Sequence, residues 1–470
     1  MTGARKGPLA VAILVALAGC AVPSPPKPVD YRNEALPALQ VPGQWTAEGE
    51  VTGPVQASWL ATFADSRLDA LVAEAMAHNP DLRVAVARVE VASEYVNLAD
   101  STLYPQVNLL ARGGGEMSGD SSGLQGVGLF ADWELDLWGR LRSARAATTA
   151  GYESTVADTE YARQSVAALV AKSYFLAVEA TLQHRLAGEM VTASEQLVAL
   201  AEQRQRIGKG DGIDSAVARA NLESYRDTVE KFSLARQQAL RALEALLGRY
   251  PAADVEIATQ LAAPPGPVPT GLPSELLERR PDVVAADQRV SAAFYRVAEA
   301  KAARLPRISL TASVNDISSD LFVLKDRDNP VWSAGASLLQ PVYYGGALQT
   351  QVRIRTAEQK QAVAEYGRIG ARAFGEVEDA LSSEFASGRR AAILGRAVAE
   401  NERALGYAKD RYRVGSGDLR AVSQQQLALN ASSTALLRLQ TERLVQRVNL
   451  YLALGGGFDA ASAPVAQVEK

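Results

Sequence analysis

The feature that most constrains this chain is an internal repeat that covers most of its length. The segment HNPDL at 78–82 recurs as RRPDV at 279–283, and YPQVNL at 104–109 recurs as LPRISL at 305–310, both at an offset of 201. Further on, RIGKGD at 206–211 recurs as RVGSGD at 413–418 at an offset of 207. The second copy has therefore gained six residues in between. A repeat of this length predicts a duplicated architecture.

The N-terminus has the layout of an export signal. Arg5 and Lys6 precede an apolar run, Leu9–Ala18, that is too short to span a bilayer. The run ends in LAGC at 17–20, which resembles the lipobox of bacterial lipoproteins, and Cys20 is the only cysteine. We expect residues 1–19 to be removed and Cys20 to carry the lipid. In such lipoproteins, an acidic residue after the cysteine commonly retains the protein at the inner membrane. Because Ala21 and Val22 are not acidic, we expect this protein to be located in the outer membrane.

The composition argues against a nucleic-acid partner and against a second membrane helix. The chain has 49 basic and 53 acidic residues and a net charge of −4, which leaves no basic footprint for nucleic acid. After the signal, no stretch is continuously apolar for 18 residues. We therefore expect strands, and not helices, to form any span.

Two proline-free stretches predict unusually long helices. They run from about 138 to 207 and from about 347 to 414, and a helix of some 70 residues extends about 100 Å. Mostly apolar residues follow heptad spacing in both stretches. In the first stretch they are Leu186, Met190, Ala193, Leu197, Leu200, Arg204 and Ile207. In the second stretch they are Leu394, Val398, Leu405, Ala408 and Tyr412. Such helices must lie along other helices. An antiparallel coiled-coil structural protein is one reading of them.

The first repeat also contains a candidate transmembrane hairpin within 103–137. Within 123–137, apolar residues at the odd positions from 127 to 137 alternate with mostly small or acidic residues at the even positions from 126 to 136. In the partner segment, apolar Val107, Leu109 and Ala111 alternate with polar Gln106, Asn108 and Arg112. A glycine-rich loop, 113–122, separates the two strands. We expect Asp132, Glu134 and Asp136 to face the water-filled side.

The second repeat contains an equivalent hairpin within 306–343. Its strands cover 307–315 and 332–338, and its longer loop, 316–330, accounts for the insertion. Two half-buried soluble hairpins are the alternative, although such hairpins need a core to cover them. Four strands cannot close a barrel, so identical chains must pool their strands. A dimer would give a small filled barrel, whereas a trimer would give twelve strands and a pore.

Several motifs resemble one known family. They are LAGC at 17–20, GLPSELLERRPD at 271–282, WELDLWGRL at 133–141 and QPVYYGG at 340–346. Together they resemble the TolC-like outer membrane factors, in particular the lipoproteins of the OprM/NodT type. The resemblance implies a fold of long helices plus four transmembrane strands per chain, with a homotrimer that forms a twelve-stranded barrel continuous with a periplasmic helical tunnel.

The resemblance also implies function and partners. Such channels dock a periplasmic adaptor protein and an inner-membrane pump, here expected to be of the RND type, and release small molecules such as drugs. A duct for type I protein secretion stays open as the alternative, because the pump selects the cargo.

The resemblance places the periplasmic tips at the two Gly-x-Gly-Asp turns. The candidate gate and tip residues are Gly208, Gly210 and Asp211 in the first repeat and Gly415, Gly417 and Asp418 in the second. The simple role of each Asp is to cap the following helix. In a trimer, each Asp would also form a ring of three carboxylates that could favour cations.

Other chemistry is not expected. His78 and His184 have no second ligand at metal spacing, and the chain lacks a phosphate-binding loop, so we expect no metal, no cofactor and no enzymatic activity. The expected organisation is a lipid-anchored extension at 20–64, a first repeat at 65–250, a proline-rich linker at 251–273, a second repeat at 274–457 and a flexible tail at 458–470.

Overall fold

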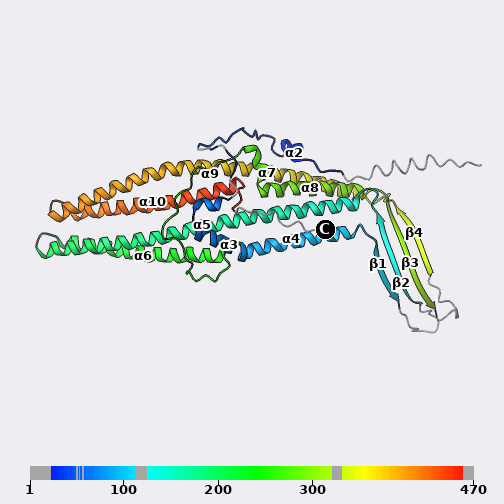
Figure 1. Ribbon diagram of the computed structural model, residues 1–470, viewed down its shortest axis with the longest axis horizontal. Helices are drawn as coiled ribbons and strands as arrows, with labels where there is room; N and C mark the ends of the chain where they lie inside the picture. Colours follow the sequence, from blue (N-terminus) through cyan, green and yellow to red (C-terminus); the bar gives the residue numbers. More distant parts are fainter. Residues whose placement is uncertain are drawn as a thin grey trace, which may run out of the picture. The chain divides into compact units, whose positions relative to one another are not determined.

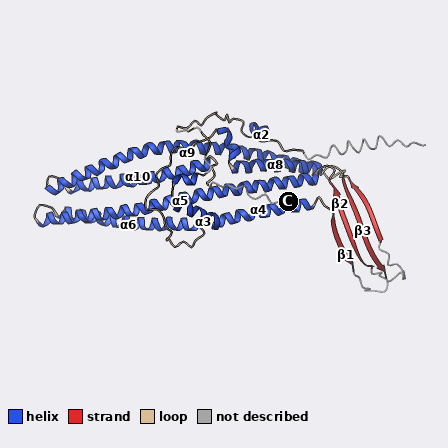
Figure 2. Ribbon diagram, in the orientation of Figure 1, coloured by secondary structure: helices blue, strands red, loops and turns tan. Residues whose placement is uncertain are grey.

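The computed structural model describes residues 23–48, 51, 53–55, 58–112, 124–319 and 331–458. Long helices dominate, accompanied by one four-stranded sheet (Figure 1, Figure 2). The elements are α2 Pro28–Ala35, the 3-10 turn η1 Trp59–Phe63, α3 Ser66–His78, α4 Pro80–Ser101, β1 Gln106–Arg112, β2 Leu124–Leu135, α5 Arg140–Arg206, α6 Gly212–Leu246, the 3-10 turn η2 Pro273–Glu275, α7 Leu276–Arg279, α8 Pro281–Ala302, β3 Arg307–Ser319, β4 Val331–Leu339, α9 Ala347–Val414 and α10 Leu419–Ala453.

The order of the elements confirms the duplication. Two helices, two strands and two further helices follow one another in 66–246 and again in 276–453. The proline-free stretches form single helices, with 67 residues in α5 and 68 in α9. Both begin and end within a few residues of the predicted bounds.

The chain divides into two compact units that cut across both repeats. Of the described residues, one unit comprises those within 23–39, 87–158 and 282–369, and the other comprises those within 40–86, 159–281 and 370–458. The first contains the sheet and the adjoining parts of the helices. The second contains the helical turns, the linker and the ends of both repeats. Because α5 and α9 each run through both units, the division does not coincide with the repeats.

The four strands form one antiparallel sheet in the order β1-β2-β3-β4. Val107 lies opposite Ala131, Ala131 lies opposite Ala312, and Ala312 lies opposite Ala334. Since facing residues point to the same side of a sheet, the predicted apolar positions of all four strands share one face. The polar positions share the other face, as the alternation predicts.

One strand is longer than expected. We expected the loop of the second hairpin to begin at Asp316, but β3 continues to Ser319. The extension follows from pairing, because residues 316–319 lie opposite Leu124–Val127 of β2. The predicted loop residues 113–122 and 320–330 fall outside the described residues.

A glycine at the end of the first repeat packs closely against residues near the start of the same repeat. Gly248, just after α6, adopts a left-handed conformation with φ of 74°, and a Cβ there would lie 2.7 Å from the carbonyl oxygen of His78. The Asn79 side chain donates to the carbonyl of Leu246 at 2.8 Å. That bond satisfies a carbonyl that the helix end leaves unpaired.

The second repeat closes in the same way with a different side chain. Gly455 has φ of 69°, and a Cβ there would lie 3.3 Å from the Cα of Arg280. The Arg280 guanidinium donates to the carbonyl of Ala453 at 3.1 Å and pairs with Glu376 at 2.7 Å. The Arg280 side chain is 1% exposed whereas the Glu376 side chain is 40% exposed, so the arginine is buried while its carboxylate partner still reaches water.

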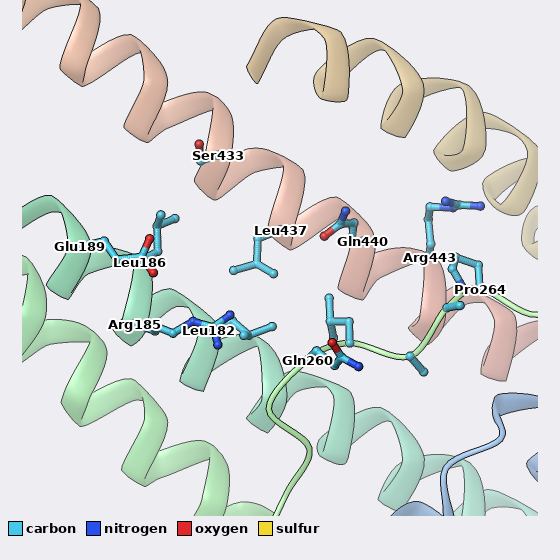
Figure 3. Close-up of a pocket in the computed structure, with 13 residues that line it drawn as sticks. Leu182, Arg185, Leu186, Glu189, Gln260, Pro264, Ser433, Leu437, Gln440 and Arg443 are labelled. Atoms are coloured by element: carbon cyan, nitrogen blue, oxygen red, sulfur yellow. The ribbon is translucent and has the colours of Figure 1, made fainter. Parts of the chain in front are cut away.

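The proline-rich linker is held against the helices of its unit. The Arg447 side chain, 4% exposed, donates to the Gly266 carbonyl and pairs with Glu384. Between the linker, α5 and α10 lies a cavity of about 530 Å³ (Figure 3). Its wall combines leucines such as Leu182 and Leu437 with charged side chains.

Helix α5 is more apolar than we expected. It includes an 18-residue window apolar enough to cross a membrane, and 56% of that window is buried within the protein. Val170, Tyr174 and Val178 of α5 are each at most 1% exposed. This burial is typical of a helix that packs against protein, and length and composition alone are weak evidence for a span.

Candidate functional site

The two turns at the helix ends have matching geometry. Gly208 and Gly415 adopt left-handed conformations, with φ of 70° and 86°. Gly417 lies so close to α9 that a Cβ would sit 3.1 Å from the Cβ of Arg411, and Gly210 is in the equivalent position against Arg204 at 3.0 Å. These contacts explain why glycine occupies the predicted tip positions.

Both aspartates cap the helix that follows them. The Asp211 carboxylate accepts from the N–H of Ile213 at 3.1 Å, and that of Asp418 accepts from the N–H of Ala421 at 2.8 Å. The simple role of these residues is therefore present, and such a cap stabilises a helix by about 0.5–2 kcal/mol. A ring of carboxylates is a property of a trimer and stays a prediction.

An arginine braces each turn. Arg204 donates to the Lys209 carbonyl at 2.9 Å, and Arg411, its repeat equivalent, donates to the Ser416 carbonyl at 3.3 Å. These bonds satisfy carbonyls that follow the last turn of each helix.

The first arginine also reaches across to the second turn. Arg204 donates to the carbonyl of Tyr412, and its guanidinium carbon lies 4.5 Å from the centre of the Tyr412 ring. The Tyr412 hydroxyl donates to Asp214 of α6 at 3.2 Å. Burial, together with the negative charge of Asp214, raises the pKa of Tyr412 to about 12, so the hydroxyl keeps its proton and remains a donor. We call Arg204, Tyr412 and Asp214 the tip contact.

A small apolar cluster supports the tip contact. It brings together all four long helices and consists of Leu197, Ala201, Ala218, Leu405, Tyr412, Leu419 and Val422. The heptad positions Leu197, Leu405 and Tyr412 are thus confirmed as packed positions. Ile207 is 60% exposed, contrary to the heptad prediction, because α5 ends at Arg206.

Sequence reasoning missed the tip contact. The heptad spacing predicts only that Arg204 and Tyr412 lie on the packed face of their helices, and it gives no role to Asp214. A signal was available, because an arginine in a heptad core position requires a partner. The partner lies 208 residues farther along the chain, and no local pattern reveals it.

The three predicted lumen-facing acids differ in their surroundings. Asp132 lies on the polar face of β2, opposite Gln106 and Thr311, and is exposed. The Glu134 carboxylate receives two bonds from Arg140, at 3.0 and 2.8 Å. Their exposure to a lumen would depend on the assembled barrel and stays a prediction.

Asp136 lies just beyond the end of β2, where it caps α5. It accepts from the N–H groups of Leu141 and Arg142, at 3.1 and 2.9 Å, and from the Arg142 side chain. Cys20 lies outside the described residues. In the described ranges, no group of three or more His, Cys, Asp or Glu residues could hold a metal ion.

Comparison with protein families gives a match to one family over both repeats. The family is described as outer membrane efflux protein, and its model matches residues 71–249 and again 272–456. Among curated proteins, the chain is 31% identical to the cation efflux system protein CusC of Escherichia coli over 462 residues, which cover 95% of this chain and 97% of that protein. It is 29% identical to the pyoverdine export outer membrane protein OpmQ of Pseudomonas putida over 468 residues, which cover 95% and 97%.

A solved structure supports the same assignment. The open-state MtrE outer membrane channel of Neisseria gonorrhoeae superimposes with a TM-score of 0.78 at 28% identity and covers 89% of this chain and 96% of that one. Proteins of this kind are trimeric channels of the outer membrane that work with efflux pumps, and they are not enzymes. This chain belongs to the outer membrane efflux protein family and is an outer-membrane efflux channel with a helical tunnel and a β-barrel.

Proposed function

We propose that three copies of this chain form the outer-membrane duct of a tripartite efflux system that releases small molecules such as drugs or toxic compounds. The sheet is the observation that carries the proposal. The predicted apolar positions of all four strands share one face, and the sheet's edge strands, β1 and β4, each pair on one side only in the described chain. Unpaired edges are costly in lipid, and twelve strands from three chains remove them while leaving a pore.

The tips are the proposed contact with a periplasmic adaptor and, through it, an inner-membrane pump of the RND type. Beside the turn between α9 and α10 lies a groove of about 720 Å³. Much of its wall is small, formed by Ala404, Ala408, Gly415, Gly417 and Ala421. Small side chains let another helix approach closely, which suits a helical partner.

The tips are also the proposed gate. Around a threefold axis, Asp418 of the second turn would form a ring of three carboxylates that attracts cations. Asp211 is the corresponding candidate in the first turn. The tip contact supports a closed state, because Arg204 and Tyr412 tie the two turns of each chain together.

Lipidation of Cys20 is proposed as the membrane anchor. Labelled palmitate should enter the protein, and Cys20→Ser should abolish labelling while the barrel still inserts to some extent. Labelling of the variant at the level of the unmodified protein would remove the anchor from the proposal.

Restoring the chain to cells that lack its gene, and measuring export from those cells, tests the function directly. Cells that carry this chain together with an adaptor and an inner-membrane pump of the RND type should accumulate less of a fluorescent drug than cells that carry the adaptor and the pump alone. Export of cations, of pyoverdine and of a secreted protein should be measured in parallel, because CusC is named for cation efflux and OpmQ for pyoverdine export. Export of the protein alone would favour the type I secretion duct. The coiled-coil structural reading is wrong, since the family consists of channels.

A further inference from the structure

The two repeats differ in charge where the sheet meets the helices. In the first repeat, this rim has three acids and three arginines, and all six are paired. The pairs are Arg140 with Glu134 at 2.8 Å, Arg142 with Asp136 at 3.1 Å, and Arg145 with Asp100. The charges of the first rim therefore compensate one another.

The rim of the second repeat has cations without matching acids. Lys301 stands where the first repeat has Asp100, and Arg304 and Arg307 follow it. The six positions equivalent to the paired residues include no acid in the second repeat, and within the described part of the chain none of these three cations pairs with a carboxylate. Lys301 and Arg304 are exposed, whereas Arg307 is half-buried at the start of β3.

Exposed apolar and aromatic side chains lie beside these cations. The turn after β4 presents Val342, Tyr343 and Tyr344, which are 90%, 87% and 54% exposed. Gln340 holds this turn next to the segment that follows α8, because its side chain donates to the Arg304 carbonyl at 3.4 Å. Tyrosines are enriched at the boundary between membrane and water, where the ring contacts lipid and the hydroxyl reaches water.

The position of Lys301 on α8 indicates that it faces outward. It follows Asp287 by fourteen residues, which places it on the same helix face about 21 Å farther along the axis. Asp287 accepts a hydrogen bond from Tyr31 of α2, whose ring also packs edge-on against Tyr366. The segment before α2 leads to the proposed lipid anchor, so α2 must lie on the outer side of the tunnel wall. This step rests on that anchor.

We propose that Lys301 and Arg304 bind the headgroup phosphate of anionic phospholipids in the leaflet that faces the periplasm, with Tyr343 and Tyr344 in contact with the same lipids. We call Lys301 and Arg304 the lipid patch. Basic residues beside membrane-spanning segments attract anionic lipids, and each cation near an anionic surface strengthens binding about fivefold. Three copies of the patch would surround one channel.

Native mass spectrometry of the full-length lipidated trimer tests the lipid patch. The protein is titrated with phosphatidylglycerol or with phosphatidylcholine, and retained lipids are counted. The variant Lys301→Gln/Arg304→Gln should bind phosphatidylglycerol about 25-fold more weakly, with little change for phosphatidylcholine. The matched control is Lys231→Gln/Arg236→Gln, which removes two exposed cations from α6 and should bind as the unmodified protein does.

Three outcomes would overturn the proposal. The first is that the patch variant and the control variant bind phosphatidylglycerol equally well. The second is that the unmodified protein binds phosphatidylglycerol and phosphatidylcholine equally well. The third is that millimolar inorganic phosphate displaces the lipid, which would indicate a general anion site. The variant Lys301→Arg/Arg304→Lys keeps both charges and should keep lipid binding. Single-channel conductance should not change in any of these variants, so a failed lipid patch and a failed channel are distinguishable.

Discussion

Replacing Tyr412 with phenylalanine removes one hydroxyl from the tip contact and leaves the ring in place. The ring still packs in the apolar cluster and still lies under the Arg204 guanidinium. Asp214 loses the donor that reaches it at 3.2 Å. The change therefore isolates one charged hydrogen bond between the two turns.

The expected magnitude follows from the surroundings of Asp214. A hydrogen bond to a charged group contributes about 1.5–3 kcal/mol, and the lower end applies because Asp214 is half-buried and water can replace the donor. If three chains open together, the loss is about 4.5 kcal/mol per trimer, which shifts the equilibrium about a thousandfold toward the open tip.

Single-channel recording in a planar bilayer measures this shift. Tyr412→Phe should show a larger open probability and a higher mean conductance than the unmodified channel. Tyr407→Phe is the matched control, because Tyr407 lies five residues earlier on α9 and is 69% exposed. If both variants conduct like the unmodified channel, the tip contact does not hold the gate closed.

Three further predictions concern the gate and the stability of the fold. Asp418→Ala should raise conductance and reduce cation preference, whereas a pure cap would lower only the melting temperature. Burial of the Glu244 carboxyl opposes ionisation, but hydrogen bonds from the N–H groups of residues 253–255 outweigh it and hold the pKa of Glu244 below its usual 4.5. The stability that the ionised Glu244 carboxylate contributes is present above that usual value and is lost as pH falls through the lowered pKa. The melting temperature of Glu244→Gln should therefore lie below that of the unmodified protein at neutral pH, and this difference should shrink in acid. A difference that stays constant with pH would contradict the prediction. Gly248→Ala should destabilise by at least about 1–2 kcal/mol, because φ is positive and the new Cβ meets the His78 carbonyl; Gly188→Ala, in a helix with nothing within 4 Å of its Cβ, should not destabilise in thermal melts.

The long helices and the sheet could be predicted because their signals are local. A proline-free stretch with apolar heptads specifies α5 and α9 almost to the residue. Alternation specifies which residues share a sheet face, since a shift of one residue would move every side chain to the other side. The end of β3 could not be located, because Asp316, Ser318 and Ser319 are polar and lie in the strand through pairing with β2.

The tip contact could not be predicted because it depends on how two distant turns approach each other. The Gly-x-Gly-Asp pattern marks the turns and the caps, and both are confirmed. It does not show that Arg204 crosses to Tyr412 while Arg411, its repeat equivalent, braces only its own turn among the described contacts. Similar residues in the two copies thus have different partners.

The differences between the repeats therefore locate function better than their similarities. Gly248 and Gly455 each allow the end of a repeat to pack closely against its start. The side chain that bonds the helix end differs, because it is Asn79 in the first repeat and Arg280 in the second. At the tips, the positions of Asp214 and Tyr412 hold Ala421 and Gln205 in the opposite repeats. The hydrogen bond between Tyr412 and Asp214 joins the two turns of one chain. At a contact between the turns of neighbouring chains in a trimer, the equivalent positions, Gln205 and Ala421, could not form this bond. If the six turns alternate around the axis, the junctions between chains are the weaker ones and should separate first when the tunnel opens.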